Sequence, residues 1–444
     1  MHTRPYQRTA LSLCLLLILL LVARVGQGER AARAQEELCQ GDFLPVAPPL
    51  TELGSDEYVR MDGGPTGFRG GLYPGGTNRR PPEHEAAALA AAARIQPLDE
   101  AGQPAPDGKI VLMSVGMSNT SSEFNGFMSL THENGLHLSN PALVLVNGAQ
   151  GGRVSDWWAD PESAVWPELD GRLHHKRVSH AQVQAVWIKL TQTRGGDFPA
   201  KAEALQADLV RVVQNLKAYF PNLQIAYLSS RTRSYMYGRG LSPEPVAYET
   251  GFAVKWLVEA QIGGEPELNF DPAQGEVRAP VLSWGPYLWI DGENARADDA
   301  VWLAEDMIGD CTHPSRSGNT KVAAMLYDFF QSDTTAHPWF MGTVAPAATA
   351  VPNEPAATST EQPPTATPAT LPTERASEPP VAASSAEPEK AALGDTAQRT
   401  PAPEAVGTRP AAAQHSSPVI LPITISVLFL LIAGAGVWWR SHHT

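Results

Sequence analysis

The sequence predicts a three-layer α/β/α domain built on a mainly parallel five-stranded sheet, between about residues 105 and 340. Short apolar runs rich in Val, Leu and Ile recur five times in this region, as is typical of buried parallel strands. Segments with helical spacing separate these runs, and such alternation indicates helices on both faces of one sheet. The five runs are Ile110–Val115, Ala142–Val146, Val183–Leu190, Leu223–Leu228 and Val281–Trp284.

Three segments between or after the strands have the spacing of amphipathic helices. They are Pro199–Tyr219, Glu244–Ile262 and Arg316–Phe330. The first is the clearest, because its apolar residues fall three or four positions apart and form one stripe. The members of that stripe are Leu205, Leu209, Val212, Val213 and Leu216.

The amino terminus has the composition of an export signal. Arg4 and Arg8 precede an apolar run from Ala10 to Ala23, and small or polar residues follow as far as Gly28. This order is typical of a secretory signal peptide, which we assign to residues 1–28. An uncleaved signal anchor is the alternative. In both cases the rest of the chain is expected outside the cytoplasm.

Residues 29–104 are expected to form a loop-rich amino-terminal arm. The stretch Gly70–His84 is dense in Gly and Pro, which favours a loop. The alanine-rich stretch Glu85–Ile95 predicts one short helix. The arm either packs around the core or forms part of the rim of the site, and the sequence leaves both open.

The carboxyl terminus predicts a stalk and a membrane anchor. Residues 341–417 are dominated by Ala, Pro, Thr, Ser and Glu, a composition that buries too little apolar surface to fold. Residues 418–439 are apolar and uncharged, which is long enough for one transmembrane helix. Residues 440–444 would be a cytoplasmic tail. The expected protein is a single-pass cell-membrane protein with an extracytoplasmic domain.

Charge and cysteine content limit the remaining possibilities. The net charge of the 444 residues is −14, which argues against a nucleic-acid partner. Outside the signal region the cysteines are Cys39 and Cys311, and export permits a disulfide between them. Two buried free thiols are the alternative. The pattern predicts no metal site, because His132 and His137 are five apart and a zinc helix needs histidines four apart.

Ser118 lies where a nucleophile could be held. The first strand ends at Gly116, and polar helix-starting residues follow at once. Open α/β sheets bind ligands at the carboxyl ends of their strands, so Ser118 is expected at that edge. The alternative is a helix cap, a role that Asn119 or Thr120 could fill instead.

A serine needs a base and an orienting acid to become nucleophilic. Asp310 and His313 are three residues apart, just before the predicted helix that starts near Arg316. This spacing allows His313 to face a serine while Asp310 fixes its tautomer. By themselves, these two residues are equally compatible with an ordinary loop and cap.

Taken together, the motifs resemble a known family. Gly116-Met117-Ser118-Asn119 with Asp310-Cys311-Thr312-His313 is similar to the SGNH (GDSL-like) hydrolases, and nearest to the sialate O-acetylesterase-like carbohydrate esterases. The resemblance implies a flavodoxin-like sheet and ester hydrolysis without a cofactor. It also implies that Ser118 is the nucleophile, His313 the base and Asp310 the acid.

The family's oxyanion hole maps less evenly onto this chain. The resemblance implies donors from the Ser118 backbone N–H and from Gly152, with Gly151 as the alternative. The family's third donor is an asparagine side chain after the third strand. Here the chain has Gln192 at that place, whose amide could donate in its stead.

Aromatic and cationic residues near strand ends are the candidates for substrate contact. Trp157 and Trp284 could stack on a sugar ring, and Arg231 could meet an anionic group; core packing and pairing with surface acids are the alternatives. The resemblance implies an acylated carbohydrate as substrate, with O-acetyl the expected ester. A surface binding or adhesion module without activity is the competing hypothesis, and a lipase is a third.

Overall fold

The computed structural model describes residues 43–133, 140–238 and 240–342. The predicted signal peptide, the predicted stalk from residue 343 onward and the predicted carboxyl-terminal helix therefore lie outside the described residues, as does Cys39. No helix in the described ranges has the length and apolar character needed to cross a membrane.

A five-stranded parallel sheet forms the centre of the described chain, as predicted. Its strand order is β4-β3-β5-β6-β7, which is the flavodoxin-like order. Every residue of β3 and β5 is buried, in keeping with strands covered on both faces. The strands are β3 (Ile110–Gly116), β4 (Leu143–Asn147), β5 (Val183–Lys189), β6 (Ile225–Leu228) and β7 (Val281–Trp284).

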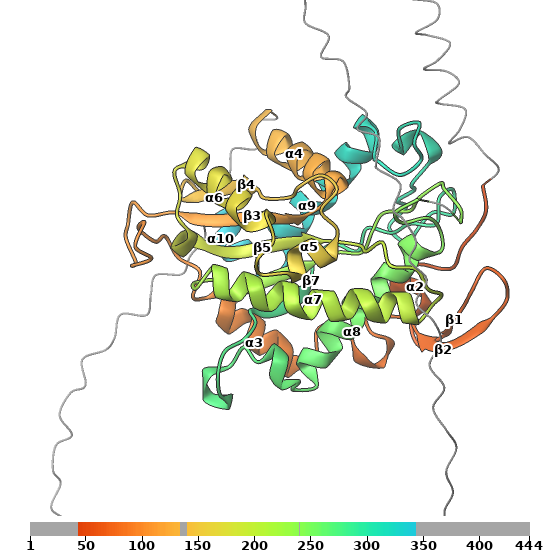
Figure 1. Cartoon of the computed structure of the whole chain (residues 1–444), viewed down its shortest axis with the longest axis horizontal. Helices are drawn as coiled ribbons and strands as arrows, with labels where there is room; N and C mark the ends of the chain where they lie inside the picture. Colours follow the sequence, from red (N-terminus) through yellow and green to blue (C-terminus); the bar gives the residue numbers. More distant parts are fainter. Residues whose placement is uncertain (1–42, 134–139, 239, 343–444) are drawn as a thin grey trace, which may run out of the picture. The chain divides into compact units, whose positions relative to one another are not determined.

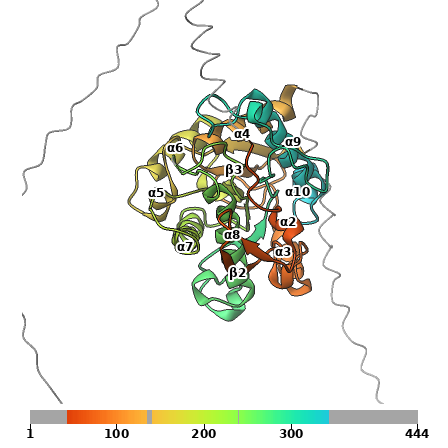
Figure 2. The ribbon, with the colours of Figure 1, turned by 90° about the vertical axis from the view of Figure 1, so that its right-hand side faces the viewer.

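Helices cover both faces of the sheet (Figure 1). Two clusters of buried apolar side chains fill the space between the layers. Figure 2 shows α5 and α7 on one side and α9 and α10 on the other. One core is made with α5 (Ser155–Ala159), α6 (Val165–Lys176), α7 (Ala200–Tyr219) and α8 (Val246–Ile262). The other is made with α3 (Pro82–Ala92), α4 (Ser118–Glu133), α9 (Arg316–Ser332) and α10 (His337–Met341).

The amino-terminal arm packs around the core. It contains α2 (Leu50–Leu53) and a hairpin of β1 (Glu57–Val59) with β2 (Pro65–Arg69), followed by α3. The Tyr58 hydroxyl donates to Glu249 on α8 at 3.1 Å, and the indole N–H of Trp284 donates to the Leu72 carbonyl at 2.7 Å. Of the two placements that the sequence left open, the structure favours packing against α8 and β7.

The chain reverses direction across the sheet after β3, and this places Ser118 at a switch point. The connection after β3 leads to β4 on one side and the connection after its other neighbour β5 leads to β6 on the opposite side, so the connections leave the carboxyl ends of these two adjacent strands in opposite directions. Such a point opens a crevice in doubly wound sheets. Ser118 is the first residue of α4, directly beyond it.

Gly116 makes the close approach that this turn requires. A Cβ at Gly116 would lie 2.3 Å from the Thr120 hydroxyl and 2.5 Å from the Lys189 carbonyl oxygen. We expect Gly116→Ala to lower the free energy of unfolding by about 1–3 kcal/mol, the usual cost of overpacking, in chemical denaturation. Gly171→Ala on α6 is the control, since nothing lies within 4 Å of a Cβ there. Equal midpoints for both variants would contradict the argument.

Candidate active site

The structure brings Ser118, His313 and Asp310 together. The Ser118 Oγ lies 2.7 Å from His313 Nε2, and His313 Nδ1 lies 2.5 Å from Asp310 Oδ2. A carboxylate can only accept, so Nδ1 carries the hydrogen and Nε2 is left to accept from the serine hydroxyl. The arrangement is a continuous hydroxyl–imidazole–carboxylate chain.

The Asp310–His313 loop holds its own carboxylate in place. Asp310 Oδ1 accepts from the backbone N–H groups of Thr312 at 3.0 Å and His313 at 2.8 Å. Burial of the Asp310 carboxyl opposes its ionisation, but these donors and the imidazole outweigh that effect and hold the pKa of Asp310 below its ordinary value. Asp310 is therefore ionised at neutral pH.

Asn119 and Cys311 fix this loop against the rest of the site. The Asn119 amide donates to the Thr312 carbonyl at 2.8 Å, and the Cys311 carbonyl accepts from the Tyr235 N–H at 3.0 Å. Cys311 also takes part in a disulfide, which excludes the free-thiol alternative for this residue. Its pairing with Cys39 stays a prediction. Sequence reasoning had given Asn119 only a capping role.

The loop after β4 lies beside the nucleophile turn. The Gln150 N–H donates to the Gly116 carbonyl at 2.9 Å, and the Arg153 N–H donates back to Gln150 at 3.2 Å. Between them Gly152 is exposed, has a φ of +73° and has nothing within 4 Å of a Cβ. The first N–H groups of α4 have no carbonyl within the helix, so the Ser118 N–H is also available to an oxyanion.

Gln192 does not join this group, which corrects the prediction of a third oxyanion donor. Its side chain is 2% exposed and its amide donates to the Lys201 carbonyl at 3.2 Å. With Lys201, Val246 and Glu249 it lines a small space against α7 and α8. The glutamine side chain, longer than the asparagine expected at this place, donates its hydrogen bond to Lys201 and not to the site around Ser118.

We therefore expect Gln192→Met to leave kcat for ester hydrolysis within about tenfold of wild type, because loss of a true oxyanion donor costs about 10²–10³. The measurement is steady-state kinetics with p-nitrophenyl acetate, alongside a thermal melt. A hundredfold loss of kcat with an unchanged melt would restore Gln192 to the oxyanion hole.

The three residues predicted to contact substrate differ in exposure. Trp157 on α5 is 38% exposed, and the Arg153 guanidinium lies over its ring at 3.9 Å. Trp284 and Arg231 are each 2% exposed. The predictions for these two were wrong: Trp284 packs in the core beneath the arm, and Arg231 lies inside the protein rather than at its surface.

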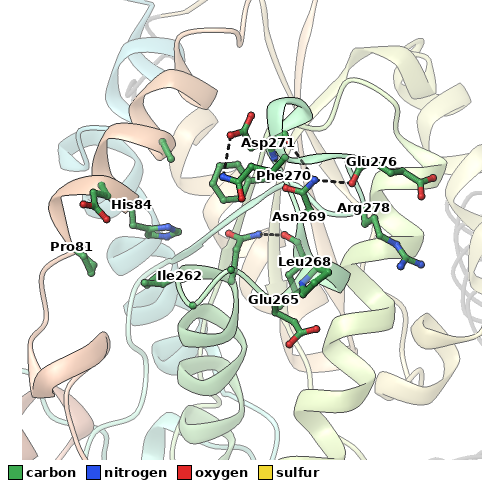
Figure 3. Close-up of a pocket in the computed structure, with 17 residues that line it drawn as sticks. Pro81, His84, Ile262, Glu265, Leu268, Asn269, Phe270, Asp271, Glu276 and Arg278 are labelled. Atoms are coloured by element: carbon green, nitrogen blue, oxygen red, sulfur yellow. Dashed lines mark hydrogen bonds between the residues drawn. The ribbon is translucent and has the colours of Figure 1, made fainter. Parts of the chain in front are cut away.

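A cavity of about 750 Å³ lies elsewhere in the molecule (Figure 3). It is formed by the start of α3, including His84, and by the segment from Gln261 to Arg278. That segment ends just before β7 begins at Val281, so the cavity is at the amino ends of the strands. Ser118 follows the carboxyl end of β3. The cavity is therefore separate from the candidate active site.

No protein-family model and no curated protein sequence matches the chain. Among solved structures it is similar to a carbohydrate esterase of family 3 from Talaromyces cellulolyticus, with 11% identity, 49% of this chain and 93% of that one covered, and a TM-score of 0.31. It is also similar to a proposed acylhydrolase from Bacteroides fragilis, with 13% identity, 58% of this chain and 100% of that one covered, and a TM-score of 0.31. For a proposed SGNH hydrolase from Slackia heliotrinireducens the identity is 12%, the coverage is 50% of this chain and 99% of that one, and the TM-score is 0.27.

Proposed function

We propose that this protein is a serine-type carboxylic ester hydrolase. The observation that carries the proposal is the unbroken chain from the Ser118 hydroxyl through His313 to Asp310, with contacts of 2.7 and 2.5 Å. In the reaction, His313 Nε2 takes the Ser118 proton as Oγ attacks the ester carbonyl. The tetrahedral intermediate collapses when the imidazolium protonates the leaving alcohol, and a water then releases the acid from the acyl-enzyme.

The backbone is proposed to stabilise the oxyanion. The Ser118 N–H at the start of α4 and the N–H of Gly152, or of Gly151, are the donors that we assign to it. A helix N-terminus carries partial positive charge, which also favours an oxyanion there. The mechanism needs no cofactor.

The substrate class that we propose is a short acyl ester, such as acetate, carried on carbohydrate. The His313 and Asp310 side chains are 39% and 40% exposed, so a bulky alcohol portion can reach them. The Trp157 ring, with Arg153 over it, offers an exposed aromatic face on the helix that follows the Gly152 loop. Aromatic faces of this kind pack against the apolar faces of sugar rings.

We further propose an extracytoplasmic site of action on a single-pass membrane anchor. This rests on the sequence of residues 1–28 and 418–439, and the disulfide at Cys311 supports it, because disulfides persist in oxidising compartments. Peptide mapping without reduction should find Cys39 joined to Cys311. Detection of a Cys311 thiol in the native protein would count against export.

The test of the enzyme proposal is covalent labelling by a fluorophosphonate probe, with the labelled residue mapped by mass spectrometry, together with hydrolysis of p-nitrophenyl esters from acetate to laurate. We expect label on Ser118 and the highest kcat/KM with acetate. No label and no hydrolysis would favour the binding-module alternative. A rise in kcat/KM with acyl length would favour a lipase.

A further inference from the structure

Three charged side chains are buried together behind the Ser118 turn. Glu123 on α4 and Lys189 at the end of β5 are both 0% exposed, and the Lys189 ammonium donates to Glu123 Oε1. Arg231, just beyond β6, is 2% exposed. Its Nε and Nη1 have no hydrogen-bond partner in the described structure, and neither has Glu123 Oε2. With all three ionised, this charged cluster carries one excess positive charge.

Burying such a cluster is costly, because ions lose their hydration and an unpaired buried charge is strongly unfavourable. Buried groups of this kind concentrate at functional sites. In this protein the buried charged cluster lies next to the turn that holds the candidate nucleophile Ser118. No sequence motif had indicated the cluster, although a lysine inside an apolar strand was a visible signal.

Lys189 is attached to the nucleophile helix at two points. Its carbonyl accepts from the Thr120 hydroxyl at 2.8 Å, and the same Thr120 oxygen accepts from the Met117 N–H at 3.3 Å. Its ammonium binds Glu123, further along α4. Lys189 is also the sheet partner of Gly116. The backbone and side chain of Lys189 thus hold both sides of the turn that presents Ser118.

We propose that Lys189 is a positioning residue for Ser118, and that the excess positive charge of the Glu123–Lys189–Arg231 cluster favours the negative charge that develops on the acyl oxygen. A fixed charge in a water-excluded region acts more strongly than one in water. The proposal rests on the esterase function proposed above and adds a residue that the triad mechanism does not use.

The cluster makes the reaction sensitive to alkaline pH. The groups that face the Lys189 ammonium are Glu123 from α4 and Arg231 from the segment after β6. Burial lowers the pKa of Lys189 to about 8; the Glu123 carboxylate opposes this shift and the Arg231 charge adds to it. Above that pH Lys189 is deprotonated, so the cluster loses its excess positive charge and the ion pair between Lys189 and Glu123 is lost. We therefore expect kcat to fall as pH rises through about 8.

The stability contribution of Lys189 has the opposite sign. Between about pH 8 and the ordinary lysine value of 10.5, the unfolded chain binds more protons at this group than the folded chain does. The free energy of unfolding that this group contributes therefore rises with pH over that window. A fall in kcat there is thus not the start of unfolding at Lys189.

The experiment measures kcat for p-nitrophenyl acetate from about pH 6 to 10 with the full chain, corrected for spontaneous hydrolysis. Lys189→Arg keeps the charge and cannot lose its proton in this range. We expect it to retain kcat at pH 7 within about tenfold and to lack the alkaline fall. Glu123→Gln removes the group that raises the pKa of Lys189, so its fall should begin at lower pH.

Lys255→Arg is the matched control. Lys255 is also a buried lysine, 6% exposed, but it lies on α8 and binds the Gly70 carbonyl at 3.0 Å and Glu259 at 2.9 Å. Its pH profile should be that of the wild type.

An unchanged alkaline fall in Lys189→Arg would overturn the inference while leaving the esterase intact. Should that variant fail to fold by circular dichroism, Glu123→Gln decides: a fall at the wild-type pH overturns the inference. Absence of hydrolysis by the wild type would remove the proposed function, and this inference with it.

Discussion

Replacing Ser118 by Ala is expected to lower kcat for p-nitrophenyl acetate by about a million-fold, the scale of loss seen when the nucleophile of a serine triad is removed. The two polar residues that follow Ser118 on α4 are engaged in other hydrogen bonds. Asn119 already donates to Thr312, and the Thr120 hydroxyl is committed to the Lys189 carbonyl. The oxyanion donors remain, so a residual rate above that of water is expected.

The fold should survive this change. Ser118 is only partly buried, and the substitution removes one oxygen whose bond is to His313. Ser122→Ala is the matched control: it removes a hydroxyl from the same helix, one that donates to the Asn119 carbonyl at 2.9 Å. We expect full activity from Ser122→Ala and the same melting curve from both variants. Equal rates for the two proteins would rule out Ser118 as the nucleophile.

The sheet could be predicted from sequence because its strands are covered on both faces. Strands β3, β5 and β6 are buried at every position, so most of their residues are apolar and each stands out in the sequence as a short apolar run. The sequence did not predict the hairpin of β1 and β2, because its strands are not buried on both faces. β2 runs along the surface, where exposed and half-buried residues alternate. Its first and last residues, Pro65 and Arg69, are both exposed, so no apolar run marks this strand in the sequence.

The proximity of Ser118, His313 and Asp310 could be predicted because it depends on a strand end and on local spacing. The other site residues depend on where a side chain turns after the strand ends, which spacing does not specify. Gln192 turns toward Lys201, and Trp284 is covered by an arm whose position the sequence left open. Arg231, three residues beyond the end of β6, is buried where it interacts electrostatically with Glu123 instead of facing solvent. These side-chain positions depend on tertiary contacts with segments that are distant in the sequence.

Asp310→Asn is expected to lower kcat by about 10⁴ while leaving the loop in place. An asparagine oxygen can still accept from the N–H groups of Thr312 and His313, as Asp310 Oδ1 does at 3.0 and 2.8 Å. The amide nitrogen would then face His313 Nδ1 and donate to it. The imidazole would have to carry its hydrogen on Nε2, the atom that must accept from Ser118.

The measurement is kcat against pH for wild type and variant, with Asp328→Asn on the exposed face of α9 as the control for the charge change. A loss below tenfold in Asp310→Asn would contradict the assigned role.

The lowered pKa of Asp310 adds a second readout, in stability. Its carboxylate stabilises the fold at pH above its ordinary value near 3.8, and this contribution is lost as pH falls through the lower value of the folded state. Acid denaturation of Asp310→Asn should therefore lack this part of the pH dependence, whereas Asp328→Asn should follow the wild type. Asp310→Asn should therefore be less stable than the wild type at neutral pH, and this difference should disappear as the pH falls below about 3.8. A kinetic loss of about 10⁴ together with a stability difference that disappears in acid would attribute both effects to the Asp310 carboxylate and its hydrogen bonds to His313. A stability difference that persists in acid would instead indicate damage to the loop.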